Sequence, residues 1–400
     1  MLKKIAGMSG ALALAQIVNF IAISYGSKLF GAEEFGKYSY VNSLSLAVSV
    51  LFYLKADNVI LLDSNDEISK TLYHLNRYSA FLLMSAVFIT VIVSLIYHDA
   101  ESVYLTLAGV VLAYFNSQFI VLGSALIKED KTSKYGITAV VRPAVMLLGQ
   151  YIATYTPKFI YPMVIIRLIS EAIAAISRKR KSEIRKYEII KTKEYLLKRK
   201  DYFLYGTVAS LLNSLSQQIP MLVLPFKYSY ESLAFFSLAF ALTVAPMGII
   251  LSPLRSLFLK QLSSTNRVKK IVYKNIVFLI LPSVFIILFF NLFSGWLVSS
   301  FWGDEWESTA EYMAWISFWV ASGLVSSPSY SYMIYSAKQK TIVNLENIFL
   351  AAKLILMFLI NVWSINLPDV VFGIILLGVL YNIVLIAISF KALTNENEYS

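Results

Sequence analysis

Apolar stretches and short polar breaks alternate along the whole chain, with a period of roughly 30 residues. Each apolar stretch is roughly 20 residues long, which is the length of α-helix that crosses a hydrocarbon core about 30 Å thick. A helix also satisfies its own backbone hydrogen bonds, as a segment in contact with lipid must. We therefore predict an all-α polytopic membrane protein with about 12 transmembrane helices.

The predicted spans divide evenly on either side of a basic stretch in the middle of the chain. This division predicts an N-terminal six-helix lobe over residues 1–176, a basic cytoplasmic linker over residues 177–202 and a C-terminal six-helix lobe over residues 203–400. Both lobes begin on the same side of the membrane, as in a parallel pseudo-repeat about an axis along the membrane normal. The predicted spans are Ile5–Phe30, Tyr38–Leu62, Tyr78–Tyr97, Val103–Ile127, Tyr135–Tyr155, Phe159–Ile176, Phe203–Leu224, Ser232–Leu259, Ile271–Phe293, Ala310–Tyr335, Ile342–Trp363 and Val370–Ala392.

The distribution of lysine and arginine predicts which side of the membrane each loop faces. With the N-terminus placed in the cytoplasm, most of the 35 basic residues fall in cytoplasmic segments or at the cytoplasmic ends of spans. Only Lys37, Lys158 and Lys227 fall in external segments. Cytoplasmic loops of membrane proteins carry such an excess of basic residues, so both termini are predicted to be cytoplasmic.

Composition agrees with a membrane protein and narrows its chemistry. The 400 residues are 58% hydrophobic and only 15% charged, with a mean hydropathy of +0.66, whereas a soluble domain carries about 25% charged residues. The absence of cysteine excludes disulfides and thiolate metal sites. The basic residues behind the net charge of +11 are concentrated in the predicted cytoplasmic loops. Membrane topology accounts for them, so we expect no nucleic-acid partner.

The basic linker also carries apolar residues among its charges, namely Ile184, Tyr187, Ile190 and Leu197. A segment of this kind can form an amphipathic helix on the anionic lipids of the inner leaflet. Anionic membrane lipids are therefore an expected partner, and a simple connecting segment that only sets the topology is the alternative.

Charged residues inside the predicted spans are the first candidates for function. A charge within hydrocarbon costs about 2.5–3.5 kcal/mol on insertion scales, so it usually faces protein or water. Arg142 precedes Pro143, which opens the helix, and Arg167 lies four residues before Glu171 on the same helix face. We predict a cationic central cavity. Its predicted basic residues are Arg142, Arg167, Lys353, Lys55, Arg255 and Lys28, and the candidate carboxylates for ion coupling are Asp57, Glu171 and Glu346.

Each of these candidates also has a structural alternative. Lys28 and Arg255 lie near span ends, where a basic side chain can reach the membrane surface, and the Arg167–Glu171 pair can simply hold its helix together. The polar residues Asn213, Gln217 and Gln218, just before Pro220, are predicted to line the cavity at a discontinuous helix. Hydrogen bonding between helices is the alternative for them.

Two short motifs resemble those of a known family. Residues 30–38 read Phe-Gly-Ala-Glu-Glu-Phe-Gly-Lys-Tyr, which is similar to the loop after the first helix in polysaccharide flippases. Residues 301–306 read Phe-Trp-Gly-Asp-Glu-Trp, and with Ala310 they are similar to that family's turn before the tenth helix. The chain thus resembles the O-antigen and capsule repeat-unit flippases (Wzx-type) of the multidrug/oligosaccharidyl-lipid/polysaccharide exporter superfamily. Both motifs are turns, in which Gly31 and Gly303 permit a positive φ.

The resemblance implies a function and its partners. Such a flippase moves undecaprenyl-pyrophosphate-linked oligosaccharides from the cytoplasmic to the outer leaflet of the bacterial inner membrane, for O-antigen of lipopolysaccharide or for capsule. A cationic cavity would then hold the pyrophosphate, because arginine binds phosphate oxygens bidentately and lysine offers a point charge. Lipid-linked oligosaccharide is the expected substrate, and other polysaccharide-assembly membrane proteins are candidate partners.

Two other classes of protein remain as alternatives. A small-molecule or drug exporter of the same superfamily is one, although a cationic cavity disfavours cationic cargo. A polysaccharide polymerase is the other, although the longest predicted external loop, about residues 291–309, has no histidine or arginine. The chain has no Gly-Lys-Ser/Thr phosphate loop, no His-Glu-x-x-His and no Gly-x-Ser-x-Gly. We therefore expect no catalytic residues, no cofactor and no metal.

Overall fold

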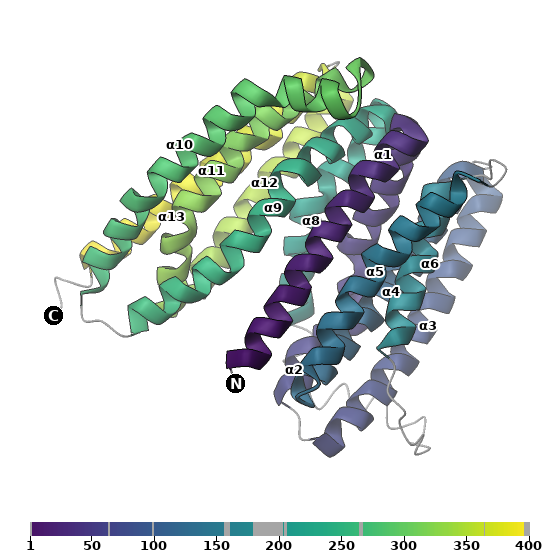
Figure 1. Ribbon diagram of the computed structural model, residues 1–400, viewed down its shortest axis with the longest axis horizontal. Coiled ribbons are helices and arrows are strands. Elements are labelled where there is room, and N and C mark those ends of the chain that lie inside the picture. Colours follow the sequence, from purple (N-terminus) through teal and green to yellow (C-terminus); the bar gives the residue numbers. More distant parts are fainter. Residues whose placement is uncertain are drawn as a thin grey trace. The chain divides into compact units, whose positions relative to one another are not determined.

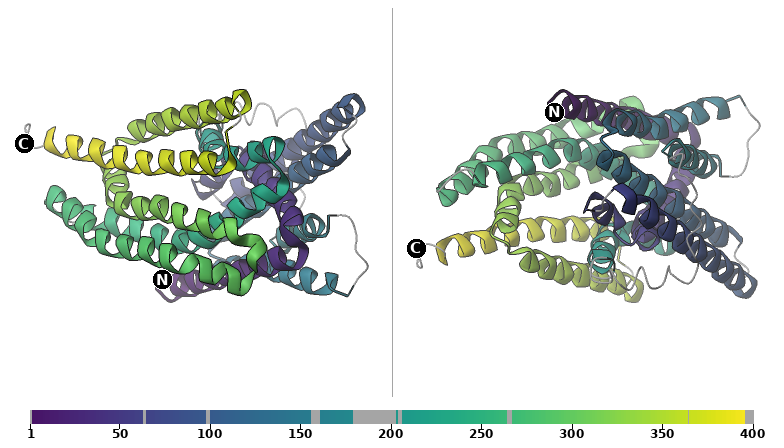
Figure 2. Two further views of the ribbon diagram at one scale, coloured as in Figure 1. Left: turned by 90° about the horizontal axis from the view of Figure 1, so that it is seen from above. Right: turned by 90° about the horizontal axis from the view of Figure 1, so that it is seen from below.

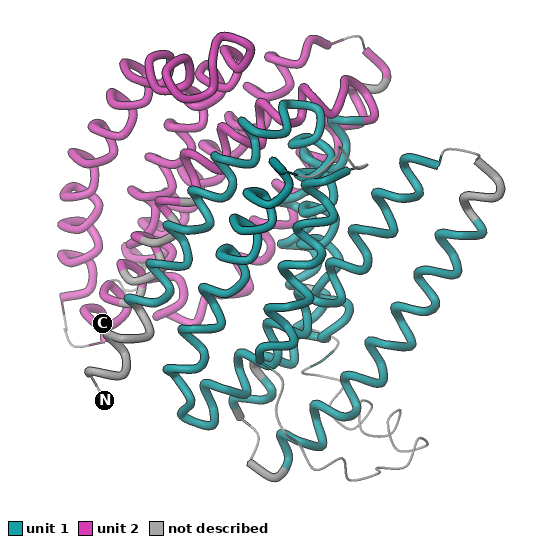
Figure 3. Tube along the Cα trace, turned by 45° about the vertical axis from the view of Figure 1, so that its right-hand side comes forward, with its two compact units in different colours: residues 1–225 teal, residues 226–400 magenta. Residues whose placement is uncertain are grey.

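A computed structural model describes the chain except for residue 1 and residues 63–64, 98–99, 156–160, 179–202, 204–205, 264–266, 364 and 396–400. The described residues form helices joined by short turns, with no strand among them (Figure 1). They divide into two compact units, which we call unit 1 (residues 1–225) and unit 2 (residues 226–400) (Figure 3). Most of the predicted linker, from residue 179 onward, lies outside the described residues, and the predicted division at residues 177–202 stays a prediction.

Unit 1 is built around the long first helix. Its helices are α1 (Leu2–Tyr53), α2 (Ala56–Leu62), α3 (Asn65–Tyr97), α4 (Ala100–Lys128), α5 (Thr132–Ala153), α6 (Pro162–Ser177) and α8 (Gly206–Lys227), whose last two residues belong to unit 2. Helix α1 packs against α4, α5 and α6, and α4 also contacts α2 and α3. The result is a helical bundle in which α1, α4, α5 and α6 enclose a common interior.

Two backbone breaks divide the N-terminal part of unit 1. Gly31 adopts φ 79° and ψ 175° inside α1, which separates that helix into the two predicted spans on either side. Leu54 and Lys55 both have positive φ values and separate α1 from α2. The region of φ and ψ that Gly31 occupies is almost restricted to glycine, so the residue type alone explains where α1 bends.

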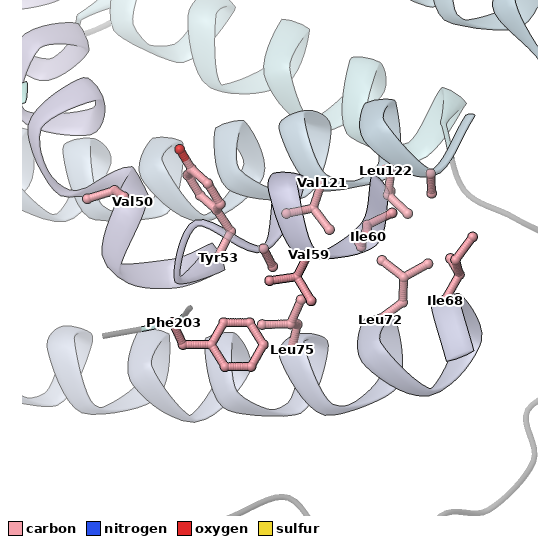
Figure 4. Close-up of a cluster of buried hydrophobic side chains, with 12 residues drawn as sticks. Val50, Tyr53, Val59, Ile60, Ile68, Leu72, Leu75, Val121, Leu122 and Phe203 are labelled. Carbon is pink, nitrogen blue, oxygen red and sulfur yellow. The ribbon is translucent and has the colours of Figure 1, made fainter. Parts of the chain in front are cut away.

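A cluster of buried apolar side chains holds α1, α2, α3 and α4 together at this second break (Figure 4). Tyr53 and Ile60 come from α1 and α2, Leu72 comes from α3, and Val121 comes from α4; Phe203 packs into the same cluster. These side chains pack closely together, which makes the position sensitive to small changes of volume. The cluster therefore fixes the chain where the regular helix is interrupted.

Unit 2 is arranged around α11. Its helices are α9 (Tyr230–Ser263), α10 (Val268–Phe301), the 3₁₀ turn η2 (Asp304–Trp306), α11 (Glu307–Tyr335), α12 (Gln339–Val362) and α13 (Leu367–Asn395). Helix α11 packs against α9, α10 and α13, and α12 lies beside α13 (Figure 2). Two serines of α11 bond to α13: Asn382 accepts from the buried Ser326 at 2.9 Å and donates to the half-buried Ser322 at 2.9 Å. Polar contacts of this kind join helices inside a membrane.

Each predicted span has a helical counterpart among the described residues: α1 covers the first span and most of the second, and α2 forms the end of the second after the break at Leu54 and Lys55. Seven described helices are long and apolar enough to cross a membrane by length and composition alone, with α1 counted once. Helices α6, α8, α9 and α11 also match predicted spans but are not among these seven, and α6 is too short to qualify at 16 residues. The predicted all-α multi-spanning architecture is thus the architecture of the described chain.

Candidate functional site

The interior of unit 1 contains a cluster of two arginines around one carboxylate. Arg142 Nη1 lies 3.5 Å from Glu171 Oε1, and Arg167 Nη1 lies 3.0 Å from Glu171 Oε2. The Glu171 side chain is 0% exposed, that of Arg167 is 9% exposed and that of Arg142 is 29% exposed. The three groups carry one net positive charge, so the cluster is an environment suited to an anion.

Local sequence places each of these side chains. Arg167 and Glu171 are one turn apart on α6, which puts them on the same face. Arg142 reaches them from α5, where the buried Pro143 follows it and removes one helix hydrogen bond. Asn42 of α1 accepts a long hydrogen bond of 3.4 Å from Arg167 Nη2. Three helices thus meet at this ionic cluster, and the predicted Arg167–Glu171 pairing is present.

A third arginine, Arg178, lies beside this cluster and was not among the predicted site residues. It follows α6 directly and is buried, with Nε donating to Thr138 Oγ1 at 3.0 Å and Nη1 donating to the Phe119 carbonyl at 2.6 Å. Its guanidinium carbon lies 3.4 Å from the Phe119 ring centroid, and that of Arg142 lies 5.2 Å from the same centroid. Gly123 leaves the space that the Arg178 guanidinium fills.

Burial explains the electrostatics of Arg178. It lowers the pKa of the guanidinium to about 10, because desolvation disfavours the charged form. The group remains charged at neutral pH. In the sequence Arg178 opens a run of basic residues and reads as part of the linker, so only the packing of α4 and α5 around it distinguishes it from its neighbours.

Among the described residues, Lys55, Asp57 and Lys28 form no ion pair with this cluster. Lys55 Nζ lies 3.2 Å from Asp57 Oδ2, and this pair sits at the break between α1 and α2. Lys28 is exposed on α1. In α8, Gln217 is exposed and donates to Asn213 at 2.7 Å, and the neighbouring Gln218 is half-buried. Helix α8 continues through Pro220, so the predicted discontinuous helix there is wrong. The predicted contact of these residues with a substrate stays a prediction.

A second ionic cluster in unit 1 was also missed by the sequence reasoning. Lys37, placed in an external turn by the sequence, is buried, and its Nζ lies 2.7 Å from Glu33 and 2.9 Å from Glu101. The same nitrogen lies 5.1 Å from the ring centroid of Tyr161, which stacks on Tyr104. Lys37 therefore ties the second half of α1 to the beginnings of α4 and α6.

Unit 2 holds the remaining predicted charges. Lys353 of α12 is buried, with Nζ 5.7 Å from the Trp319 ring centroid of α11. The Arg255 guanidinium carbon of α9 lies 4.5 Å from the Tyr330 ring centroid. Glu346 and Arg255 both interact electrostatically with Tyr381 of α13. These side chains place both signs of charge inside unit 2, next to aromatic rings that can bind cations.

The fold and the buried charges define the class of this molecule: it is a multi-pass α-helical membrane protein with the fold of known transporters. The chain belongs to a family described as polysaccharide biosynthesis protein, whose match covers residues 27–311 and thus more than half of the chain. No curated protein sequence matches it.

Solved structures agree with this fold at low sequence identity. The lipid II flippase MurJ, in an inward closed conformation, superposes with a TM-score of 0.75 at 15% identity, over 96% of this chain and 87% of MurJ. An inward-facing MATE multidrug resistance transporter of the MOP superfamily gives 0.63 at 14% identity, over 98% and 96%. A MOP superfamily transporter from Pyrococcus furiosus gives 0.53 at 15% identity, over 98% and 94%. Both flippase and transporter relatives therefore share the architecture.

Proposed function

We propose that this protein is a flippase that moves undecaprenyl-pyrophosphate-linked oligosaccharide repeat units across the bacterial inner membrane, from the cytoplasmic to the outer leaflet. The product would serve O-antigen or capsule synthesis. The observation that carries the proposal is the Arg142–Glu171–Arg167 cluster, built around a fully buried carboxylate, within a polysaccharide-biosynthesis membrane protein. The likeness of its fold to a lipid II flippase supports the same cargo class.

The chemistry of the substrate explains why such a cluster is useful. A lipid-linked oligosaccharide carries a pyrophosphate between its prenyl chain and its sugars, and bare hydrocarbon opposes the passage of that charge. Guanidinium groups hold phosphate oxygens bidentately and give up hydration more readily than an ammonium does. In this mechanism Arg142 and Arg167 bind the pyrophosphate, the prenyl chain stays in lipid, and the two lobes alternate access around the bound head group.

The residues of unit 2 take supporting roles in this proposal. Lys353 and Arg255 add positive charge for phosphate or for acidic sugars, and Asp57, Glu171 and Glu346 are candidates for ion coupling. Anionic lipids would contact the basic linker at residues 177–202, and other polysaccharide-assembly membrane proteins would receive the product. A small-molecule exporter is the second candidate, because MATE transporters share the fold.

Cells that lack the gene provide the direct test. Complete lipid-linked repeat units should accumulate on the cytoplasmic leaflet, and surface polymer should be lost. Single units that reach the outer leaflet unpolymerised would instead indicate a polymerase. Normal lipid-linked sugars with normal surface polymer would favour the small-molecule exporter.

Charge removal tests the site in the same cells. Arg167→Ala and Lys353→Ala should each reduce transport at least about tenfold, because each deletes a charge-assisted contact with the substrate. Lys270→Ala, at an exposed position at the start of α10, is the matched control and should transport normally. Full transport by both charge-removal variants at normal protein levels would contradict the cationic-cavity assignment.

A further inference from the structure

The two arginines that the proposed function assigns to phosphate are already occupied. Both carboxylate oxygens of Glu171 face a guanidinium, at 3.0 and 3.5 Å. The Nε atoms of Arg142 and Arg167 are buried and have no hydrogen-bond partner among the described residues. The cluster thus holds one carboxylate while both Nε donors remain unused. An anion with more oxygen atoms than a carboxylate could accept hydrogen bonds from these donors as well.

A pyrophosphate diester differs from Glu171 in charge as well as in oxygen count. It brings two negative charges, which two guanidinium groups match, whereas Glu171 brings one. Once those guanidinium groups turn to the phosphates, the Glu171 carboxylate is a buried charge that has lost its ion-pair partners. Such a group takes up a proton rather than remain ionised, because burying an unpaired charge is far more costly.

We propose that Glu171 is an internal substitute for the substrate's pyrophosphate, which displaces its carboxylate from Arg142 and Arg167 while that carboxylate takes up one proton from water. The inference rests on the proposed function and adds the manner of coupling to it. When the substrate leaves, the proton dissociates and the carboxylate returns to both arginines. Each pyrophosphate that binds therefore displaces one carboxylate, which takes up one proton, so substrate binding depends on the proton concentration.

The charged and titratable groups around Glu171 come from α1, α5 and α6 and from the residue after α6. Arg142 comes from α5, Arg167 from α6 and Arg178 from the residue after α6; α1 contributes the buried Tyr38, which interacts electrostatically with Glu171. Tyr38 is a neutral phenol at physiological pH. Arg178 donates to Thr138 and to the Phe119 carbonyl, so its hydrogen bonds are committed elsewhere. Arg142 and Arg167 are therefore the ion-pair partners of Glu171, and its carboxylate is protonated when they turn to the substrate.

Binding of a small pyrophosphate diester to the full chain in lipid nanodiscs tests the exchange. The symmetrical dimethyl diester of pyrophosphate is the probe, since its two charges do not change between about pH 5 and about pH 8. Calorimetry in buffers of different ionisation enthalpy should find one proton taken up per diester bound. The wild-type affinity should weaken by up to about tenfold for each unit of rising pH, because the bound state holds one more proton.

Glu171→Gln mimics the neutralised carboxylate with little change of shape. This variant should bind the diester about tenfold more tightly than wild type at neutral pH, without proton uptake and without dependence on pH. Glu171→Asp keeps an ionisable group and should keep the dependence on pH, which separates titration from a packing effect. Arg167→Gln should weaken binding in either background.

The outcomes distinguish this inference from the proposed function. If wild type binds the diester without taking up a proton, and Glu171→Gln binds it equally well, the exchange is overturned and the flippase proposal stands. If neither wild type nor Glu171→Gln binds the diester, the anion site itself is absent and both proposals fall. Tighter, pH-independent binding by Glu171→Gln together with proton uptake by wild type supports the exchange.

Discussion

At the scale of single residues, Arg178 shows a buried cation whose direct contacts are neutral groups. Its hydrogen-bond acceptors are the Thr138 hydroxyl and backbone carbonyls, and its flat face lies against the Phe119 ring and 4.7 Å from the Tyr135 ring centroid. A charged hydrogen bond contributes about 1.5–3 kcal/mol, and a desolvated cation–π contact contributes about 2 kcal/mol. These contacts offset the cost of removing the guanidinium from water.

Replacement of Arg178 should therefore destabilise the protein. We expect Arg178→Ala to lower stability by about 2–4 kcal/mol, and Arg178→Lys to recover only part of that loss, because an ammonium cannot reproduce the planar fork. Thermal unfolding of purified protein in detergent, followed by the helical circular dichroism signal, measures both. A melting temperature for Arg178→Ala equal to that of wild type would mean that these contacts contribute nothing net.

At the scale of elements, two glycines make the same kind of break in different parts of the chain. Gly31 has φ 79° and ψ 175° within α1, and Gly303 has φ 94° and ψ 175° between α10 and η2. A Cβ at either position would meet nothing within 4 Å, so the requirement for glycine comes from the backbone and not from crowding. The break at Gly303 leads into Trp306, which is fully buried and packs on Phe235 with ring centroids 5.5 Å apart.

The same chemical change should have opposite effects at two glycines of unit 2. Gly303→Ala places a side chain in a conformation that costs about 1–3 kcal/mol for residues other than glycine, so the protein should melt at lower temperature. Gly295, within α10, also has open space around its Cβ position. Gly295→Ala should be neutral or stabilising by up to about 1 kcal/mol, since glycine disfavours a helix. Equal melting temperatures for the two variants would contradict the backbone argument.

At the scale of the whole molecule, sequence periodicity predicted the helices well, and it predicted the contacts within one helix. Arg167 and Glu171 pair as their spacing on α6 indicates, and Gly31 breaks α1 where the turn motif lies. Sequence periodicity did not predict contacts between helices, such as that between Arg142 of α5 and Glu171 of α6. Membrane helices are apolar on most faces, so hydropathy does not reveal which face meets which neighbour. The burial of Arg178 could not be predicted either, because in the sequence it opens a run of basic residues and only its contacts with α4 and α5 set it apart.

The membrane orientation of the chain is the remaining prediction at this scale, and helix α9 offers a direct way to test it. Its 34 residues extend about 50 Å at 1.5 Å per residue, enough for its two ends to reach opposite faces of a bilayer. Lys227 precedes α9, Lys270 follows it, and both side chains are exposed. The excess of basic residues predicts Lys227 outside and Lys270 in the cytoplasm.

Because the chain has no cysteine, one introduced thiol gives an unambiguous label. In right-side-out membrane vesicles, a membrane-impermeant maleimide should label Lys227→Cys and leave Lys270→Cys unlabelled until the vesicles are permeabilised. Inside-out vesicles should give the reverse. Each variant is the other's control for expression and reactivity, since both replace an exposed lysine beside the same helix. Labelling of Lys270→Cys from outside would invert the predicted topology, and with it the direction in which the proposed flippase carries its substrate.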